Sequence, residues 1–241
     1  MTAAPLVADR SEAAVLLDVL IAPQAAFAAL RERPRWLLAF VVTAVLGIVG
    51  SLLQIPAGLH VAAATFQANA ANNPTIAEMS AAERQHMLGI ALSTQHWTWI
   101  VYPILVFVGV TIAALVIAAI NAMANGEIGF RRAFALAMNV APLHFGIGYL
   151  VIGALAYLHG PQSFTTTRDV FGLLPSLAWF APGAPPKLFA ALAYVNVFEI
   201  WSFVLLGIGI GIVGKLARAV SYVVSFVVTF GGIAFVAPFA R

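Results

Sequence analysis

Two ionisable side chains, Glu199 and His144, lie inside long apolar stretches, where they could bind or transfer a proton. A carboxylate at the bilayer centre is disfavoured by about 2.5–3.5 kcal/mol, so Glu199 needs a partner or a proton. Both residues fall near the middle of their stretches, 133–157 and 189–213, which puts each of them near the membrane midplane, where the two could meet. Asn196 lies three residues before Glu199 and would extend the contact into a polar cluster on one helix face.

Two hypotheses explain this polar cluster. It is either a proton relay or ion site, or a buried polar contact that sets the packing of two helices. Proton-coupled paths usually contain more ionisable groups than one pair. Few other polar side chains within the stretches are placed to line a path: Asn139, Asn196, Ser202 and Thr229. We therefore favour the structural hypothesis and keep transport as the alternative.

A glycine run within the fourth apolar stretch resembles a dinucleotide-binding fingerprint: Gly207, Gly209, Gly211 and Gly214. That fingerprint needs a preceding strand in a soluble βαβ unit, which an apolar stretch of this length does not offer. We predict instead that Gly207 and Gly211 form a GxxxG pair, which lets two membrane helices approach closely.

Signatures of catalysis and metal binding are missing from the sequence. The chain has no cysteine, and His60, His86 and His96 match no local metal-ligand spacing. HExxH, GxSxG and phosphate-binding glycine loops do not occur. We therefore predict a protein that is not an enzyme, with no metal and no cofactor.

The composition indicates a membrane protein. Of 241 residues, 62% are hydrophobic and 9% are charged, against about 45–50% and 25% in soluble domains. The net charge is +3, but the basic residues are dispersed between apolar blocks, which is typical of membrane spans and not of a nucleic-acid surface. The expected partner is therefore the lipid bilayer, and no nucleic acid is expected.

We predict an all-α fold, a polytopic bundle of five transmembrane helices preceded by an amphipathic segment. Residues 1–35 form a cytosolic or interfacial arm, in which Ser11 and Pro23 begin short helices on the membrane surface or against the bundle. Residues 36–241 form the transmembrane domain. Its predicted spans are 36–55, 97–120, 133–157, 189–213 and 222–240.

Two of the predicted loops are long. In residues 56–96, which follow the end of the first span at Pro56, Ser80 and Glu83 form a capping-box pattern ahead of an amphipathic helix. Residues 158–188 are rich in proline and bulky apolar side chains, and we expect them to fold on the outer leaflet.

The basic residues predict an orientation. A cytoplasmic N-terminus places eight of the twelve Lys and Arg residues inside and the C-terminus outside. Four of these are juxtamembrane residues of the short loops: Arg131, Arg132, Lys215 and Arg218. Besides orienting the spans, Arg131 and Arg132 could contact anionic headgroups or a cytosolic partner.

Three segments resemble the Yip1 domain family of membrane proteins with a cytosolic N-terminus and five spans. They are LIAPQAAFAALRERPRW (20–36), NGEIGFRRAFALAMNVAP (125–142) and LLPSLAWFAPGAPPKLFAALAYVNVFEIW (173–201). The last is similar to the segment that leads bacterial members into a Phe-x-x-Trp fourth helix. Glu199 departs from the family pattern, which has an uncharged residue there.

The resemblance to bacterial members implies a bacterial inner (cell) membrane protein that accompanies transporters or envelope assemblies. Together with the missing catalytic set, it predicts a non-enzymatic protein that organises or modulates a membrane partner complex, or forms a homo-oligomer. The alternative is a small transporter or channel built around His144 and Glu199.

Overall fold

The computed structural model describes residues 11–233, and every regular element in that range is a helix. The predicted all-α class is therefore confirmed. The chain divides into two compact units that the helices pass through. The described part of the first unit comprises 11–43, 106–144 and 198–232, and that of the second comprises 44–105, 145–197 and residue 233.

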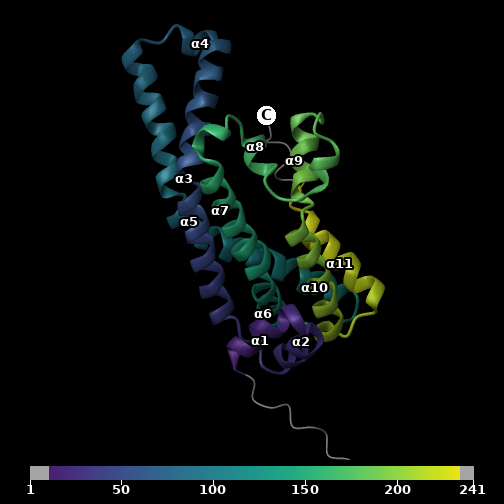
Figure 1. The fold of residues 1–241 in the computed structure, drawn as a ribbon. Helices are drawn as coiled ribbons and strands as arrows, with labels where there is room; N and C mark the ends of the chain where they lie inside the picture. Colours follow the sequence, from purple (N-terminus) through teal and green to yellow (C-terminus); the bar gives the residue numbers. More distant parts are fainter. Residues whose placement is uncertain (1–10, 234–241) are drawn as a thin grey trace, which may run out of the picture. The chain divides into compact units, whose positions relative to one another are not determined.

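The first unit begins with a pair of short helices, α1 (Glu12–Ile21) and α2 (Pro23–Glu32). As the sequence predicts, Ser11 caps α1 by accepting a hydrogen bond from the Ala14 backbone N–H, and Pro23 is the first residue of α2. Both helices pack against α6 (Phe130–Ala141) (Figure 1). Their location on a membrane surface stays a prediction.

Four helices are long and apolar enough to cross a membrane: α3 (Leu37–Asn72), α5 (Ala81–Met123), the continuous run Phe130–His159 and α10 (Val197–Gly214). The membrane-protein class is thus supported with four candidate spans. The predicted fifth span, 222–240, corresponds in part to α11 (Arg218–Phe230), and residues 234–240 lie outside the described range. Five spans are not confirmed.

The first two candidate spans are much longer than the sequence predicts. We expected the first helix to end at Pro56, but α3 continues through Pro56 to Asn72. Proline is tolerated inside membrane helices because neighbouring groups satisfy the backbone that it leaves unpaired. Residues 56–96, predicted as a loop, instead form a helical hairpin made of the end of α3, the short α4 (Pro74–Ala77) and the start of α5.

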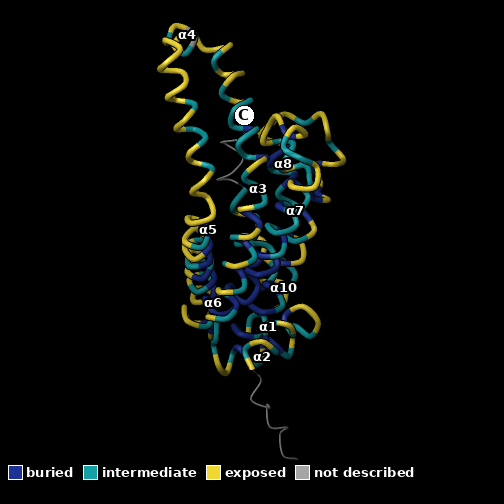
Figure 2. Tube along the Cα trace, turned by 60° about the vertical axis from the view of Figure 1, so that its left-hand side comes forward, coloured by how far each residue is buried: buried dark blue, intermediate teal, exposed yellow. Residues whose placement is uncertain are grey.

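The capping box at the start of α5 is confirmed. The Ser80 hydroxyl accepts from the Glu83 backbone N–H at 3.3 Å, and the Glu83 carboxylate accepts from the Ser80 N–H at 2.8 Å. Most residues of the first half of α5 are exposed (Figure 2). The α5 part of the helical hairpin therefore has little protein packed around it, whereas Ala57 and Val61 of its α3 part pack against Ala156 and Phe164.

The predicted fourth span is interrupted. Instead of one helix over 189–213, the chain forms α9 (Pro186–Tyr194) and α10, which begins at Val197. The backbone between them pairs with the loop at 175–177: Ser176 and Asn196 form an isolated antiparallel bridge, flanked by Leu177 N–H to Val195 O and Val197 N–H to Pro175 O. These groups bond to the loop and not along a helix, so the continuous-helix prediction is wrong.

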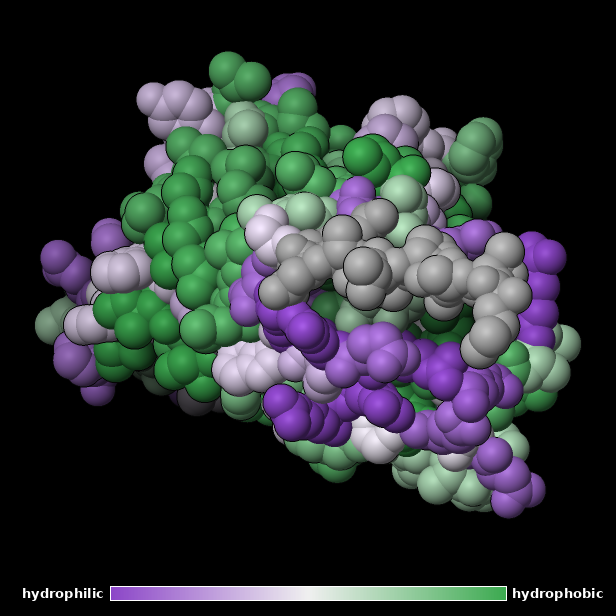
Figure 3. All heavy atoms as spheres, turned by 90° about the horizontal axis from the view of Figure 1, so that it is seen from below, coloured by the Kyte–Doolittle hydropathy of each residue, from purple (hydrophilic) through white to green (hydrophobic). Residues whose placement is uncertain are grey.

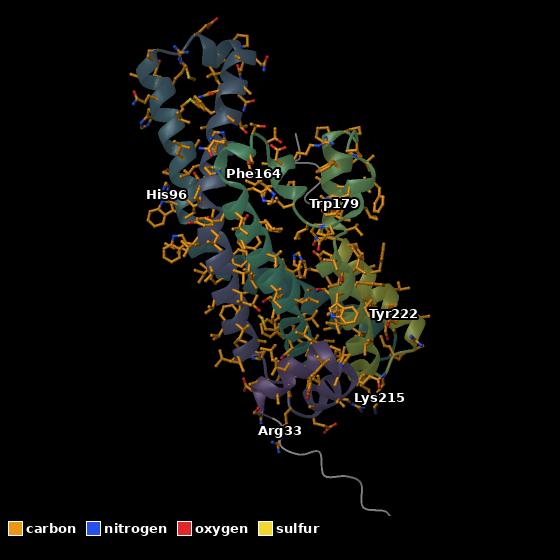
Figure 4. The ribbon with its side chains drawn as sticks, viewed as in Figure 1. Arg33, His96, Phe164, Trp179, Lys215 and Tyr222 are labelled. Carbon is orange, nitrogen blue, oxygen red and sulfur yellow. The ribbon has the colours of Figure 1, made fainter. Side chains whose placement is uncertain are left out.

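The loop before α9 folds on itself. It contains η2 (Pro161–Ser163), α8 (Thr167–Phe171) and η3 (Leu177–Phe180). The guanidinium of Arg168 lies 4.0 Å from the centre of the Phe189 ring and donates to the carbonyl oxygens of Ala184 and Pro182. Phe164 and Trp179 lie on this part of the second unit (Figure 4).

Candidate functional site

His144 and Glu199 meet in the first unit. His144 Nδ1 lies 3.0 Å from Glu199 Oε1, and the Glu199 side chain is only 4% exposed whereas that of His144 is 26% exposed. The sequence placed the two residues at similar depth, and the structure shows that they are in contact. Among the described residues, Glu199 is the most buried carboxylate that pairs with a basic side chain.

Local helix irregularities position both side chains. Glu199 is the third residue of α10, where a negative charge is favoured by about 0.3–1 kcal/mol because the helix N-terminus carries a partial positive charge. His144 lies in η1 (Pro142–Gly148), a π-helical segment between α6 and α7 (Tyr149–His159). Pro142 at its start lacks a backbone N–H, which disfavours the ordinary helical pattern there. π-helical insertions occur often at functional sites.

Asn196 occupies a different setting from the one predicted. It precedes α10, bridges to Ser176, and its side-chain amide donates to the Tyr194 carbonyl at 3.2 Å. The shared helix face with Glu199 depended on a continuous helix, which the structure does not have. The membership of Asn196 in a cluster with His144 and Glu199 stays a prediction.

The His144–Glu199 contact can hold one proton or one ion pair. A protonated imidazole and a carboxylate form a charge-assisted hydrogen bond, and a neutral imidazole can share a proton with a carboxylic acid. Breaking such a buried contact is costly, so the same geometry also fixes helix packing. Among residues 11–233, no group of three or more His, Cys, Asp or Glu side chains could hold a metal ion.

Of the four predicted juxtamembrane basic residues, Lys215 contacts a carboxylate, that of Glu127. Lys215 Nζ lies 2.7 Å from Glu127, and Arg31 Nη2 lies 3.6 Å from it. The hydrogen bond from Lys215, aided by the charges of Arg31 and Arg132, lowers the pKa of Glu127 from its usual range, although desolvation opposes this. The Glu127 N–H also donates to the Gly214 carbonyl at 3.0 Å, so the two loops are tied together.

The other basic residues stay near this end of the first unit. Arg131 is exposed and Arg132 is half-buried at the start of α6, and the Arg218 guanidinium lies 6.0 Å from the Tyr222 ring. Hydrophilic side chains gather on the face that carries α1 and α2 (Figure 3), and Arg33 and Lys215 are both at this end (Figure 4). This face is the part of the first unit most suited to water and headgroups.

Gly207 and Gly211 lie where α10 meets α11. A Cβ on Gly207 would lie 2.6 Å from the Tyr222 ring, and one on Gly211 would lie 3.2 Å from the Ser221 hydroxyl. The predicted GxxxG pair therefore packs against a neighbouring helix of the same chain. Gly209 meets Leu136 of α6 in the same way, with a Cβ distance of 2.3 Å.

A polar cavity in the second unit was missed by the sequence analysis. It has a volume of about 100 Å³ and is lined by Ser51, Gln54, Ile55, Ala57, Gly58, Gln95, Thr98, Tyr149 and Val170. Ser51 is 2% exposed, and its buried Oγ has no hydrogen-bond partner of good geometry among the described residues. Ser51 and Gln54, three residues apart in an apolar stretch, were the available signal.

The comparisons with known proteins add no relative. No protein-family profile, curated protein or solved structure matches the chain.

Proposed function

We propose that the chain is a non-enzymatic, Yip1-like integral membrane protein that organises or modulates a partner complex in a bacterial inner membrane. The observation that carries this proposal is the helical hairpin, residues 56–96, with its exposed apolar side chains. The Yip1 resemblance agrees with it through the three segments described above.

The hairpin is longer than a bilayer requires. At roughly 1.5 Å per residue, the 36 residues of α3 and the 43 residues of α5 extend about 54 Å and 65 Å, whereas the hydrocarbon core is about 30 Å thick. A large part of each helix therefore lies beyond hydrocarbon if α3 and α5 span the membrane. Lipid tails cannot cover apolar residues on that part.

Apolar side chains are nonetheless exposed there. On the part of α5 before Trp97, Met87 is 39% exposed and Ile90 is 56% exposed, and each lies beside a shallow open groove that His86 also lines. Contiguous exposed apolar patches rimmed by polar residues mark interaction sites for proteins or membranes. We infer that this surface of the helical hairpin binds the partner.

The most apolar parts of α3 and α5 are also little buried by the rest of the protein. In the most apolar window, 28% of α3 and 22% of α5 is buried within the protein, against 56% of 130–159 and 50% of α10. Such faces suit lipid or the helices of a partner, and association there adds van der Waals packing without a large hydrophobic term.

Photo-crosslinking in native membranes tests the proposal. A photoreactive amino acid at Met87 or Ile90 is expected to yield one stoichiometric partner, and the same group at Phe180, which is 87% exposed in η3, serves as the control. Co-purification of that partner with the parent, and its loss with Ile90→Glu, is the second expected result. Adducts of the protein with itself alone, or equal adducts from Phe180, would overturn the partner proposal.

The proposed orientation has a direct test because the chain contains no cysteine. Single substitutions Ser11→Cys and Ser80→Cys provide one site at the start of α1 and one at the tip of the helical hairpin. In spheroplasts, a membrane-impermeant maleimide is expected to label Ser80→Cys and to spare Ser11→Cys until the cells are lysed. The reverse labelling would refute a cytoplasmic N-terminus.

A second candidate function is a small transporter or channel, which the 3.0 Å contact between His144 and Glu199 favours. Reconstituted protein would then carry a proton or cation flux that Glu199→Gln and His144→Ala abolish. A folded parent without flux, together with variants that are only less stable, would leave the contact a structural one.

A further inference from the structure

Two classes of side chain, polar and aliphatic, line the polar cavity of the second unit. Hydroxyl and amide side chains come from three helices: Ser51 and Gln54 from α3, Gln95 and Thr98 from α5, and Tyr149 from α7. Aliphatic side chains of Ile55, Ala57 and Val170, together with Gly58, complete the lining. No Lys, Arg, Asp, Glu or His is among the lining residues, so a charged ligand would lose its hydration without a compensating charge.

Several of these polar side chains are already oriented by the protein. The Gln54 amide donates to the Gly50 carbonyl at 3.3 Å, and the Thr98 hydroxyl donates to the Gln95 carbonyl at 2.8 Å. The Tyr149 ring stacks on Tyr102 with 4.4 Å between ring centres. Several donors and acceptors of the cavity wall are thus held in place by the protein.

Ser51 supplies a buried hydrogen-bonding group to the cavity wall. Its Oγ lines the cavity and lies beside the Tyr149 hydroxyl. Gly58 matters to the same wall because a Cβ there would lie 2.7 Å from Gln95 Oε1. The absence of a side chain at Gly58 therefore makes room for the Gln95 amide.

We propose that this cavity binds a small uncharged polyol. Hydroxyl groups both donate and accept, as the serine, threonine, tyrosine and glutamine side chains require, and the CH₂ groups of a polyol fit the aliphatic wall. The volume of about 100 Å³ is well below the roughly 300–1,000 Å³ of sites for drug-sized ligands, so the cavity suits a small molecule. A three-carbon polyol such as glycerol, free or as a lipid headgroup, is the ligand that we expect.

The test uses the full chain in phosphatidylcholine nanodiscs, with glycerol as the probe and saturation-transfer NMR as the readout. The parent is expected to give a saturable signal. Ser51→Ala and Gln95→Leu are each expected to weaken the apparent affinity at least fivefold. The matched control is Gln85→Leu, an exposed position on the same helix outside the cavity, which is expected to bind as the parent does.

Two further arms complete the experiment. If Ser51→Ala does not fold, Gly58→Ala serves instead, since its Cβ displaces the Gln95 amide. Repeating the titration in phosphatidylglycerol nanodiscs distinguishes the sources, because a headgroup glycerol would compete with free glycerol and lower its signal, whereas a site for free polyol would be unaffected. No saturable signal, or equal signals from the parent, Ser51→Ala and Gln95→Leu, would overturn the proposal and leave a cavity that holds water alone.

Discussion

We expect an added methyl group to destabilise the protein most at Gly153 of α7. A Cβ there would lie 2.4 Å from the Gly50 carbonyl oxygen and 2.9 Å from its Cα, so both obstacles are backbone atoms of α3. Ordinary contact begins at 3.4 Å, and 3.4 − 2.4 = 1.0 Å is the local separation that Gly153→Ala would require. Backbone on a packed helix cannot rotate away as a side chain does, so the two helices must move apart.

The expected magnitude combines two opposing terms. Overpacking costs about 1–3 kcal/mol, and we expect the upper part of that range because the clash is with backbone. Alanine in place of glycine stabilises a helix by about 1 kcal/mol. Gly153→Ala is therefore expected to lower the free energy of unfolding by about 1–2 kcal/mol.

Gly89→Ala is the matched control. Gly89 is exposed within α5, and a Cβ there meets nothing within 4 Å, so only the helix-propensity term acts and the variant should gain about 0.5–1 kcal/mol. Both variants can be measured by SDS-induced unfolding in mixed micelles, followed by circular dichroism. Equal shifts for Gly153→Ala and Gly89→Ala would refute the close approach of α3 and α7.

Three other predictions concern polar contacts. The pKa of Glu127 is lowered in the folded protein, so its contact with Lys215 contributes to stability above the unfolded pKa of about 4.5. That contribution is lost as pH falls through the folded pKa. Glu127→Gln should therefore flatten the acid side of a plot of melting temperature against pH, and an unchanged slope would contradict this. Glu199→Ala should cost about 1–3 kcal/mol because it removes the partner of His144, whereas Glu199→Gln, which keeps an acceptor, should cost less in the same unfolding assay; equal losses would argue against the contact. Ser80→Ala should destabilise the start of α5 by about 1 kcal/mol and raise amide exchange there by roughly fivefold, with the rate in α10 as the internal control.

Features determined by neighbours in the sequence were predictable. The cap at Ser11, the proline that begins α2, and the reciprocal hydrogen bonds of Ser80 and Glu83 depend on groups within three residues of each other. The apolar stretches likewise follow from composition over about 20 residues. Helical class and the approximate place of four candidate spans needed no tertiary contact.

The meeting of His144 and Glu199 was partly predictable. Their positions within two apolar stretches indicated similar depth, but depth does not determine which face of a helix points to which neighbour. The π-helical segment Pro142–Gly148 changes that direction, and it depends on a local pattern of hydrogen bonds that a helical period does not predict. Only the structure establishes the 3.0 Å contact.

Three features were decided by tertiary structure alone. The break before Val197 exists because the loop at 175–177 offers hydrogen bonds that compete with helix continuation. The continuation of α3 through Pro56 to Asn72 runs against the local preference of proline to end a helix. The polar cavity gathers side chains from residues 51 to 170, which lie far apart in the sequence. Local sequence thus determines where a helix is favoured, whereas the backbone groups and side chains of distant segments decide where it stops and what it faces.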